Sequence, residues 1–357
     1  MNEEAPGLPP DVIEAFPALN SGFLLRDGAV GLLHETHHLR AADGLEYVLQ
    51  KVSPVFAPEI HDNIELVSRH LGSRGLPSFL LERTRTGALY MTSGSGDRWR
   101  LMTRLPGVSF HQIQSVAQAE SAGRIVGRFH RALEDFTAPL QPMGIPFRET
   151  ALYRQKLNRA FRDCADRVRG DEIAEVTRQI EERFEVLGAP YEGHQRVIHG
   201  DLKISNILFE AEGEDDAATD VATALIDFDT LMRAPLWSEW GDAWRSWCNR
   251  RGEDELDAHF DLEVFAASLQ GFAAGLGSSV ASDERGSLVD ATERISLELA
   301  TRYATDALEE SYFAWDAERF DSAYAHNLQR ARGQLALFEA ARECRAERAE
   351  LIEAILG

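Results

Sequence analysis

The chain has 357 residues, of which 44% are hydrophobic and 27% charged, a composition typical of a folded protein large enough for two lobes. Its formal net charge of −22 argues against nucleic acid and anionic membranes as partners, because both are polyanions. No apolar run approaches the roughly 20 residues of a membrane span, and no signal-peptide pattern is present, so we expect a cytoplasmic protein. Three widely spaced cysteines indicate neither a disulfide framework nor a zinc site.

The first third of the chain predicts a small antiparallel sheet. After a proline-rich arm, strand-like apolar runs follow at 23–25, 28–39 and 47–52. The pairs Asp27-Gly28 and Asp43-Gly44 separate these runs and favour tight turns between them. We therefore expect three strands that pair in chain order.

A second hairpin is predicted at 89–105, where a turn rich in Gly and Ser separates two apolar runs. Pro106 and Gly107 then interrupt the second strand. This interruption indicates a boundary between two lobes, 1–105 and 106–357.

From about residue 112 the pattern becomes helical. Apolar residues at helical spacing predict a core-facing helix at 117–133, in which we expect His130 to be structural. The run 154–187 predicts two helices that divide at Gly170-Asp171, and 256–355 predicts a helical C-terminal third.

The candidate catalytic residues follow two short apolar runs that are typical of buried strands. The loop after the first run carries His199, Asp201 and Asn206 in the spacing H-x-D-x-x-x-x-N, and the second run ends at Asp227. Phosphoryl transfer from ATP requires this arrangement, because one carboxylate orients and deprotonates a hydroxyl while an amide and a second carboxylate hold Mg²⁺. An ordinary polar turn is the alternative, but buried strands have no structural need for two acids and an amide at their mouth.

These residues, 199–203 with Asn206 and 226–229, resemble the aminoglycoside phosphotransferase and choline kinase-like superfamily, whose fold is similar to that of protein kinases. The resemblance implies an α+β fold with two lobes. The N-terminal lobe, 1–105, would bind the nucleotide on an antiparallel sheet, and the helical lobe, 106–357, would carry catalysis and acceptor binding. ATP and Mg²⁺ are the implied cofactors, and the implied partner is a small molecule.

The resemblance also implies supporting roles around the catalytic loop. His199 and Asp242 would brace the loop that presents Asp201, and Asp229 would contact the metal or brace its strand. Asp242 lies in the tryptophan-rich segment 237–250, for which we predict a helix packed beneath the loop.

For the nucleotide, the resemblance implies that Gly28 and Gly31 let the backbone approach the phosphates, although their spacing alone is more typical of a plain turn. The third strand has Gln50 where kinases of this type have a lysine. Lys51 comes one residue later, and strand alternation should turn it to the opposite face. We therefore expect Mg²⁺ and backbone N–H groups to neutralise most of the phosphate charge.

A helix expected at 58–71 would carry Asp62 or Glu65 on its inner side as the acidic partner of the nucleotide site, unless both are solvated. Adenine would bond to backbone groups of the segment that crosses between the lobes. This segment comprises Met102, Thr103, Arg104 and Leu105.

Other stretches resemble, more narrowly, the N-acetylhexosamine 1-kinase subgroup: 47–51, 62–64, 241–243, 326–328 and 330–332. This resemblance implies an acceptor that is an N-acetylhexosamine or related hexose, phosphorylated at its anomeric hydroxyl. Arg302 and Tyr312 are the implied acceptor-binding residues, since aromatic faces and a guanidinium suit a sugar ring. A core between helices would use the same residue types, so this alternative stays open.

Two rival functions remain at this point. An aminoglycoside, choline or amino-alcohol kinase would have the same fold and the same catalytic residues. A nucleotide-binding pseudokinase without turnover is the rival from another class, and it rests on the unusual Gln50. The complete set of Asp201, Asn206 and Asp227 argues against it.

Overall fold

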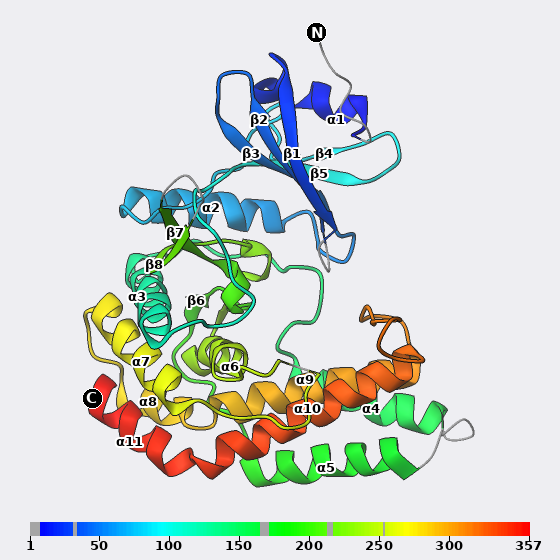
Figure 1. Cartoon of the computed structure of the whole chain (residues 1–357), viewed down its shortest axis with the longest axis vertical. Coiled ribbons are helices and arrows are strands. Elements are labelled where there is room, and N and C mark those ends of the chain that lie inside the picture. The colour runs from blue at the N-terminus through cyan, green and yellow to red at the C-terminus, as the bar shows by residue number, and fades with distance from the viewer. Residues whose placement is uncertain (1–7, 31–33, 165–170, 213–216, 253) are drawn as a thin grey trace.

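The computed structural model describes residues 8–30, 34–164, 171–212, 217–252 and 254–357. A small lobe built on an antiparallel sheet lies above a larger, mostly helical lobe (Figure 1). This is the mixed α+β, two-lobed architecture that the sequence predicts. Within the described ranges, no helix combines the length and the apolar character needed to cross a bilayer.

The N-terminal lobe contains one five-stranded sheet in the order β1-β2-β3-β5-β4, with every neighbouring pair antiparallel. Its strands are β1 (Phe23–Val30), β2 (Glu35–Ala41), β3 (Glu46–Val52), β4 (Met91–Thr92) and β5 (Arg98–Thr103). Alternation divides β3 between two faces: Tyr47 and Leu49 pack under the short helix α1 (Pro10–Ala15), while Gln50 faces the other way. Polar side chains of β3 therefore face the helical lobe.

One predicted turn in this sheet is wrong. Asp27 and Gly28 lie inside β1, opposite His38 and His37 of β2, and a register shift after Leu25 absorbs the irregularity. Both apolar runs pair with the same strand, so nothing forces the chain to reverse between them. Gly28 therefore occupies a strand, and Gly31 lies outside the described residues. The second predicted turn is confirmed, because Gly44 has a φ of +89° between β2 and β3.

The helix α2 (Ile60–Ser73) begins two residues after its predicted start and lies between the sheet and the helical lobe (Figure 1). Its apolar face, which includes Ile64, Val67 and Leu71, joins the main core of the helical lobe. The chain enters that lobe soon after β5, since Val108 pairs with Phe209. We therefore propose the lobe boundary between Leu105 and Pro106.

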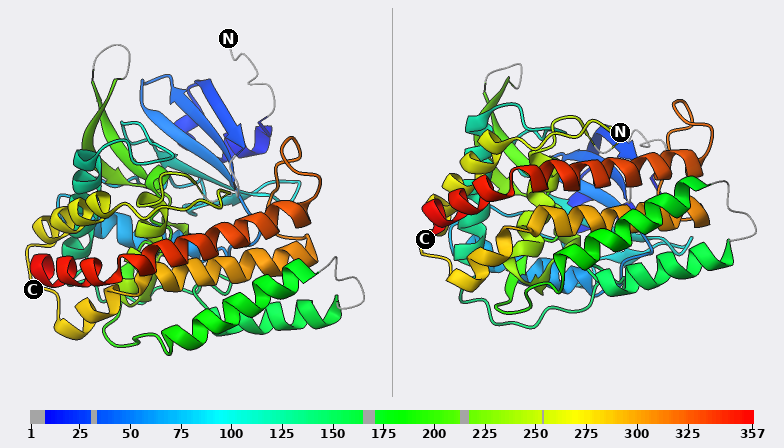
Figure 2. Two further views of the ribbon diagram at one scale, coloured as in Figure 1. Left: turned by 60° about the horizontal axis from the view of Figure 1, so that its bottom comes forward. Right: turned by 90° about the horizontal axis from the view of Figure 1, so that it is seen from below.

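The helical lobe contains the predicted helices. They are α3 (Val116–Ala132), α4 (Thr150–Asp163), α5 (Asp171–Leu187), α6 (Leu236–Trp247), α7 (Leu262–Leu276), α8 (Ser282–Leu288), α9 (Ala291–Glu309), α10 (Ala323–Glu343) and α11 (Arg345–Leu356). Figure 2 shows α4, α5, α9 and α10 side by side at the base of the lobe. The rows of helices support the central helix α6 and the loops above it.

Two small antiparallel sheets of two strands each position the polar loops. β6 (Arg196–Ile198) pairs with β9 (Met232–Ala234), and β7 (Ile207–Glu212) pairs with β8 (Ala217–Leu225). The loop 199–206 connects β6 to β7, and the loop 226–231 connects β8 to β9. Both loops therefore begin and end on paired strands, which fixes them side by side.

The backbones of α3 and α7 are in direct contact. A Cβ atom at Gly123 would lie 2.0 Å from the carbonyl oxygen of Ser268, and one at Gly271 would lie 1.8 Å from that of Glu120. Two further glycines continue this contact, Gly127 and Gly275. Only residues without a side chain permit such an approach.

Candidate active site

The catalytic loop is held in shape by its own backbone and by one histidine. Gly200 has a φ of +86°, and a Cβ atom there would lie 2.6 Å from the carbonyl oxygen of Thr230. His199 Nδ1 accepts a hydrogen bond from the Asp201 N–H at 3.3 Å, and its Nε2 lies 2.8 Å from the carbonyl oxygen of Ile226. The histidine is therefore neutral, with the proton on Nε2. It joins the loop of Asp201 to the strand end that precedes Asp227.

Asp201 presents a carboxylate that solvent and substrates can reach, with 29% of its side chain exposed. It accepts hydrogen bonds from Lys203 Nζ at 2.8 Å and Asn206 Nδ2 at 3.2 Å. Burial would lower the pKa of Lys203, but the carboxylates of Asp201 and Asp227 raise it above its usual value. The ammonium therefore stays charged beside Asp201.

Asp227 follows the end of β8, is partly buried and has a left-handed conformation, with a φ of +68°. A non-glycine residue in this region stores strain, which is common at functional sites. Burial raises its pKa, and the neighbouring Asp229 raises it further, while Lys203 acts in the opposite direction. Asn206 is tied to this strand end, because its carbonyl oxygen accepts from the N–H of Ile226 at 3.0 Å. An amide and a carboxylate thus lie on adjoining segments.

Asp229 uses both carboxylate oxygens in contacts within the protein. Arg100 donates to them from Nη1 at 2.5 Å and from Nη2 at 3.1 Å, and His34 Nε2 lies 2.7 Å away. Burial would raise the pKa of Asp229, but Arg100 and His34 hold it well below its usual range. Metal-ligating atoms of His34, Asp227 and Asp229 lie within 4.8 Å of one another. Because Arg100 donates to both oxygens of Asp229, we propose that Asp229 braces the loop and that Asp227 is the carboxylate that binds the metal ion.

The cation of the N-terminal lobe is Arg100, which the sequence analysis missed. Gln50 Oε1 accepts from Arg100 Nε at 3.0 Å and from Nη2 at 2.7 Å, so the glutamine orients the guanidinium toward Asp229. Lys51 faces the other way, as alternation predicted, and pairs with Asp97 at 3.0 Å. Gln50 and Arg100 are direct partners in the pairing of β3 with β5, a signal that appears only once that register is known.

The expected acidic partner on α2 is not found at the nucleotide site. Asp62 is exposed, and the buried Glu65 pairs with Arg69 at 2.6 Å and with Arg83 at 2.8 Å. Gln50 stands where a lysine would face an acid on α2, and Lys51 of the same strand points to the opposite face and pairs with Asp97. The buried Arg100 forms its ion pair with Asp229 instead.

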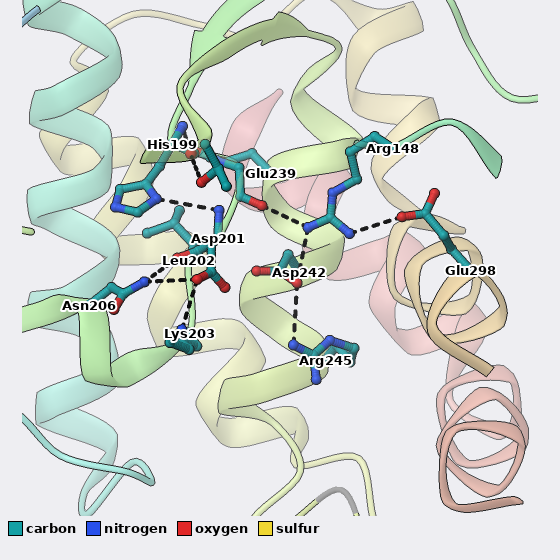
Figure 3. A network of polar contacts seen from close by, with 12 residues as sticks. Arg148, His199, Asp201, Leu202, Lys203, Asn206, Glu239, Asp242, Arg245 and Glu298 are labelled. Carbon is teal, nitrogen blue, oxygen red and sulfur yellow. Dashed lines mark hydrogen bonds and ion pairs between the residues drawn. The ribbon is translucent and has the colours of Figure 1, made fainter. Parts of the chain in front are cut away.

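Beneath the catalytic loop, Glu239 makes direct contacts in addition to the bracing that we expected from Asp242 (Figure 3). Its two oxygens accept from the N–H groups of His199 at 2.9 Å and Gly200 at 3.0 Å. Asp242 acts through Arg148, which it contacts at 3.1 Å and which donates to the carbonyl oxygen of Gly200 at 2.8 Å. Glu239 lies three residues before Asp242, so it shares a face of α6.

A cluster of buried charges completes this support. Arg148 also contacts Glu298 at 3.3 Å, and Asp242 contacts Arg245 at 3.3 Å. Burial would raise the pKa of Asp242, but Arg148 and Arg245 hold it below its usual value. Thr150 donates to Glu298 at 2.5 Å. Both acids of the cluster therefore have partners, and Asp242 stays ionised.

The segment predicted to contact adenine is partly occupied by the protein itself. The N–H of Thr103 bonds to the carbonyl of Leu80 at 2.9 Å, and that of Arg104 bonds to Glu46 at 2.9 Å. Met102 lies buried on β5, and Leu105 follows the strand. We therefore propose that adenine uses the N–H of Leu105 and nearby carbonyls rather than the N–H groups of Thr103 and Arg104.

Arg302 and Tyr312 lie together. The Arg302 guanidinium is 5.6 Å from the ring centroid of Tyr312, 5.4 Å from that of Phe313 and 5.3 Å from that of Tyr153. Asp306 fixes the loop after α9 by accepting from the N–H groups of three successive residues, 311–313. Tyr312 remains about half exposed, whereas Tyr153 is buried. The group therefore has a buried side and one aromatic ring that a ligand can reach.

The family model for the phosphotransferase enzyme family (APH) matches residues 28–274, which is more than half of the chain. The chain belongs to this family. Its members couple a nucleotide site to a hydroxyl acceptor, so the protein is a small-molecule kinase that uses ATP. The motif 199–206 and the strand end at Asp227 lie inside the matched span.

Solved structures agree with this assignment at the level of the fold. An aminoglycoside phosphotransferase from Alicyclobacillus acidocaldarius is similar at 18% identity and TM-score 0.57, covering 96% of this chain and 98% of the other. A complex of the amicoumacin kinase hAmiN with AMP-PNP, Ca²⁺ and Ami is similar at 11% identity and TM-score 0.60, covering 91% of each chain. A microcompartment-associated aminopropanol kinase is similar at 14% identity and TM-score 0.57, covering 90% and 94%. All three are kinases or phosphotransferases with small acceptors.

Proposed function

We propose that this kinase transfers the γ-phosphoryl group of Mg·ATP to the anomeric hydroxyl of an N-acetylhexosamine or a related hexose in the cytoplasm. The observation that carries the choice of acceptor is the Arg302 guanidinium, surrounded by the rings of Tyr153, Tyr312 and Phe313. Aromatic faces bind the apolar face of a sugar ring, and a guanidinium donates to its oxygens.

Asp201 is the proposed base. Its carboxylate is accessible, and Lys203 and Asn206 hold it in one orientation, so it can accept the proton of an acceptor hydroxyl that lies within hydrogen-bonding reach. Lys203 stays protonated beside it and would stabilise negative charge on the transferred group. His199 and Glu239 position the loop and do not touch the substrates in this proposal.

Asn206 and Asp227 are the proposed ligands of Mg²⁺. Their amide and carboxylate oxygens are the hard donors that this ion prefers. When bound, Mg²⁺ neutralises charge on the ATP phosphates and orients the γ-phosphoryl group. Partial burial and then Asp229 raise the pKa of Asp227, which is consistent with a carboxylate that would bind a cation.

Two acids near the proposed acceptor group bear on the rival acceptors. Asp306 is occupied by backbone N–H groups and by Asn327 Nδ2 at 2.9 Å. Glu298 is occupied by Arg148 and Thr150. Neither offers a free carboxylate to an ammonium group, so the contacts favour a neutral sugar over an aminoglycoside, choline or amino alcohol.

An acceptor screen with analysis of the product tests this proposal. Purified protein, Mg·ATP and a panel of hexoses, N-acetylhexosamines, amino alcohols and aminoglycosides would be assayed for ADP formation. Phosphorus and proton NMR would then identify the phosphorylated atom. We expect a sugar 1-phosphate and, for Arg302→Ala, a higher KM for the sugar with the ATP KM nearly unchanged.

Asp201→Asn serves as the control for chemistry, with kcat expected to fall about 10²- to 10⁴-fold while nucleotide affinity is retained. A 6-phosphate, an amino-alcohol phosphate or an unchanged sugar KM in Arg302→Ala would contradict the choice of acceptor. Parental kcat in Asp201→Asn would instead remove Asp201 from the role of base.

A further inference from the structure

A second cavity lies beneath the catalytic loop. Its volume is about 660 Å³, within the usual range of ligand pockets, and it is enclosed by the start of α4, the end of α5, the segment 188–195, β9 and the first turn of α6. The lining includes Arg148 but none of the residues proposed for the base, the metal or the acceptor. The cavity is therefore distinct from the site of phosphoryl transfer.

Aromatic side chains form part of the wall of this cavity. They include Phe147, Phe184, Tyr191 and Trp237. The indole of Trp237 is fixed by a hydrogen bond from Nε1 to the carbonyl oxygen of Tyr191 at 2.8 Å, and the guanidinium of Arg294 lies 6.0 Å from its ring centroid. Such walls suit a flat, apolar body.

Two buried donors that line the cavity have no partner. Ser238 is 1% exposed and the Arg148 side chain 6% exposed, yet Ser238 Oγ and Arg148 Nε bond to nothing in the described ranges. Ser238 and Asp242 are one turn apart on α6, and Arg148 contacts Asp242, so both donors lie along the same helix face. Buried donors are normally satisfied, which indicates a missing acceptor at this place.

The charges around the cavity favour an anion. In the described part of the chain, Arg233 and Arg294 donate only to backbone carbonyls and have no carboxylate partner, although the protein carries a net charge of −22. The acids of the lining, Glu149, Glu185 and Glu192, are all solvent-exposed. The helix α6 also begins at this cavity, after Pro235 and without a side-chain cap. The helix dipole at its N-terminus favours negative charge.

We propose that this cavity binds a small planar organic anion, a carboxylate or a phosphate monoester, independently of nucleotide and acceptor. The anionic group accepts from Ser238 Oγ and Arg148 Nε, and the planar body packs on Trp237. Because Arg148 also donates to the carbonyl oxygen of Gly200, the ligand is coupled to the catalytic loop. The cavity is thus an effector site of the kinase.

Calorimetric titration with benzoate and phenyl phosphate tests this inference. The full-length protein would first be saturated with Mg·AMP-PNP, so that the nucleotide site is filled. At least one of the two anions should bind at least about tenfold more tightly than benzamide or benzyl alcohol, because the neutral probes lack the anionic acceptor. Preference for benzoate identifies a carboxylate ligand, and preference for phenyl phosphate identifies a phosphate monoester.

Two pairs of matched variants locate the binding. Ser238→Ala removes the unpartnered hydroxyl and should weaken the anion at least about threefold, whereas Ser68→Ala removes an equally buried, unpartnered hydroxyl on α2 and should not. Arg233→Gln should also weaken the anion. Arg178→Gln removes a charge outside the lining, in a surface ion pair on α5, and should leave binding unchanged.

Three results would overturn the inference. They are equal binding of the neutral and anionic probes, binding insensitive to Ser238→Ala and Arg233→Gln, and displacement of the anion by the phosphorylated or unphosphorylated acceptor. The coupling is tested separately by kcat at saturating ATP. A bound anion that leaves kcat unaltered would disprove the link through Arg148.

Discussion

Two buried arginines support the active site, one on each side of the catalytic cleft. Arg100 lies 1% exposed on β5 and contacts Gln50 of the same sheet and Asp229 of the helical lobe. Arg148 lies below the catalytic loop and contacts Asp242 and Glu298, both within the helical lobe. Each arginine binds an acid that lies next to a segment with a proposed catalytic or metal-binding carboxylate, Asp227 for Arg100 and Asp201 for Arg148.

The difference between them is the location of their partners. The Arg100 contact crosses between the lobes, so any change in the angle of the lobes must stretch or break it. The Arg148 contacts stay inside one lobe and are insensitive to such movement. A change in the angle between the lobes would therefore act on the segment of Asp229 and Asp227 rather than on the loop of Asp201.

Breaking the lower cluster should have the largest effect. Arg148→Met leaves Asp242 and Glu298 as buried acids without this partner, so we expect a loss of about 3–5 kcal/mol in the free energy of unfolding. Denaturant titration measures it. The double variant Arg148→Met/Glu298→Gln should recover part of the loss, because one uncompensated charge is gone. A change below about 1 kcal/mol would show that the cluster is dispensable.

Breaking the contact between the lobes should be less damaging to stability and more specific in function. Arg100→Met leaves Asp229 with only His34, which we expect to cost about 2–4 kcal/mol and to weaken Mg·ATP binding. Nucleotide titration with and without Mg²⁺ checks this. The acceptor KM should change little, because Asp201 and its loop keep their contacts. Equal loss of affinity for both substrates would show that the two arginines are not functionally separate.

Acid stability tests the surroundings of Arg100. Burial, and then Arg100, lowers the pKa of His61 from 6.5 to about 4. The unfolded chain therefore binds more protons between these values, and up to about 3 kcal/mol of stability is lost as the pH falls from 6.5 to 4. His61→Phe should flatten this part of the stability curve. His111→Phe, at an exposed position, should leave the curve unaltered.

The smallest expected effect sharpens the comparison most directly. Lys51 pairs with Asp97 at 3.0 Å. The two side chains are 37% and 35% exposed, so this contact is a surface ion pair. Lys51→Met should change stability and the ATP KM by less than about 1 kcal/mol in equivalent free energy. Steady-state kinetics at fixed Mg²⁺ measures this. A large rise in the ATP KM would show instead that Lys51 takes part in binding the phosphates.

The sequence was sufficient for the parts of the fold that depend on local periodicity. The helix around Ile125 and the tryptophan face of α6 were predicted, and Trp240 and Trp244 are indeed fully buried. The hairpin of β4 and β5 was also predicted. In each case the residues that determine the element are neighbours along the chain.

Contacts between distant segments were not predictable in the same way. Arg100 and Asp229 are 129 residues apart, and Arg148 and Glu298 are 150 apart. An arginine in a strand and one in a loop carry no local sign that they will be buried. Asp242 was expected to brace the loop and acts on it through Arg148. Glu239 on the same face accepts from the backbone N–H groups of the loop, and spacing alone does not say which acid reaches them.

The glycine contact between α3 and α7 has a consequence for the mutational robustness of the kinase. Alanine at Gly123 or Gly271 would have to push two backbones apart by more than an ångström, since real Cβ contacts are about 3.4 Å or longer. The displaced α3 would carry with it Ser121, whose hydroxyl accepts the N–H of Ala222 in β8 at 2.8 Å. That strand ends just before Asp227. Two helix positions without any side chain therefore help to fix the strand that carries the proposed metal ligand, Asp227.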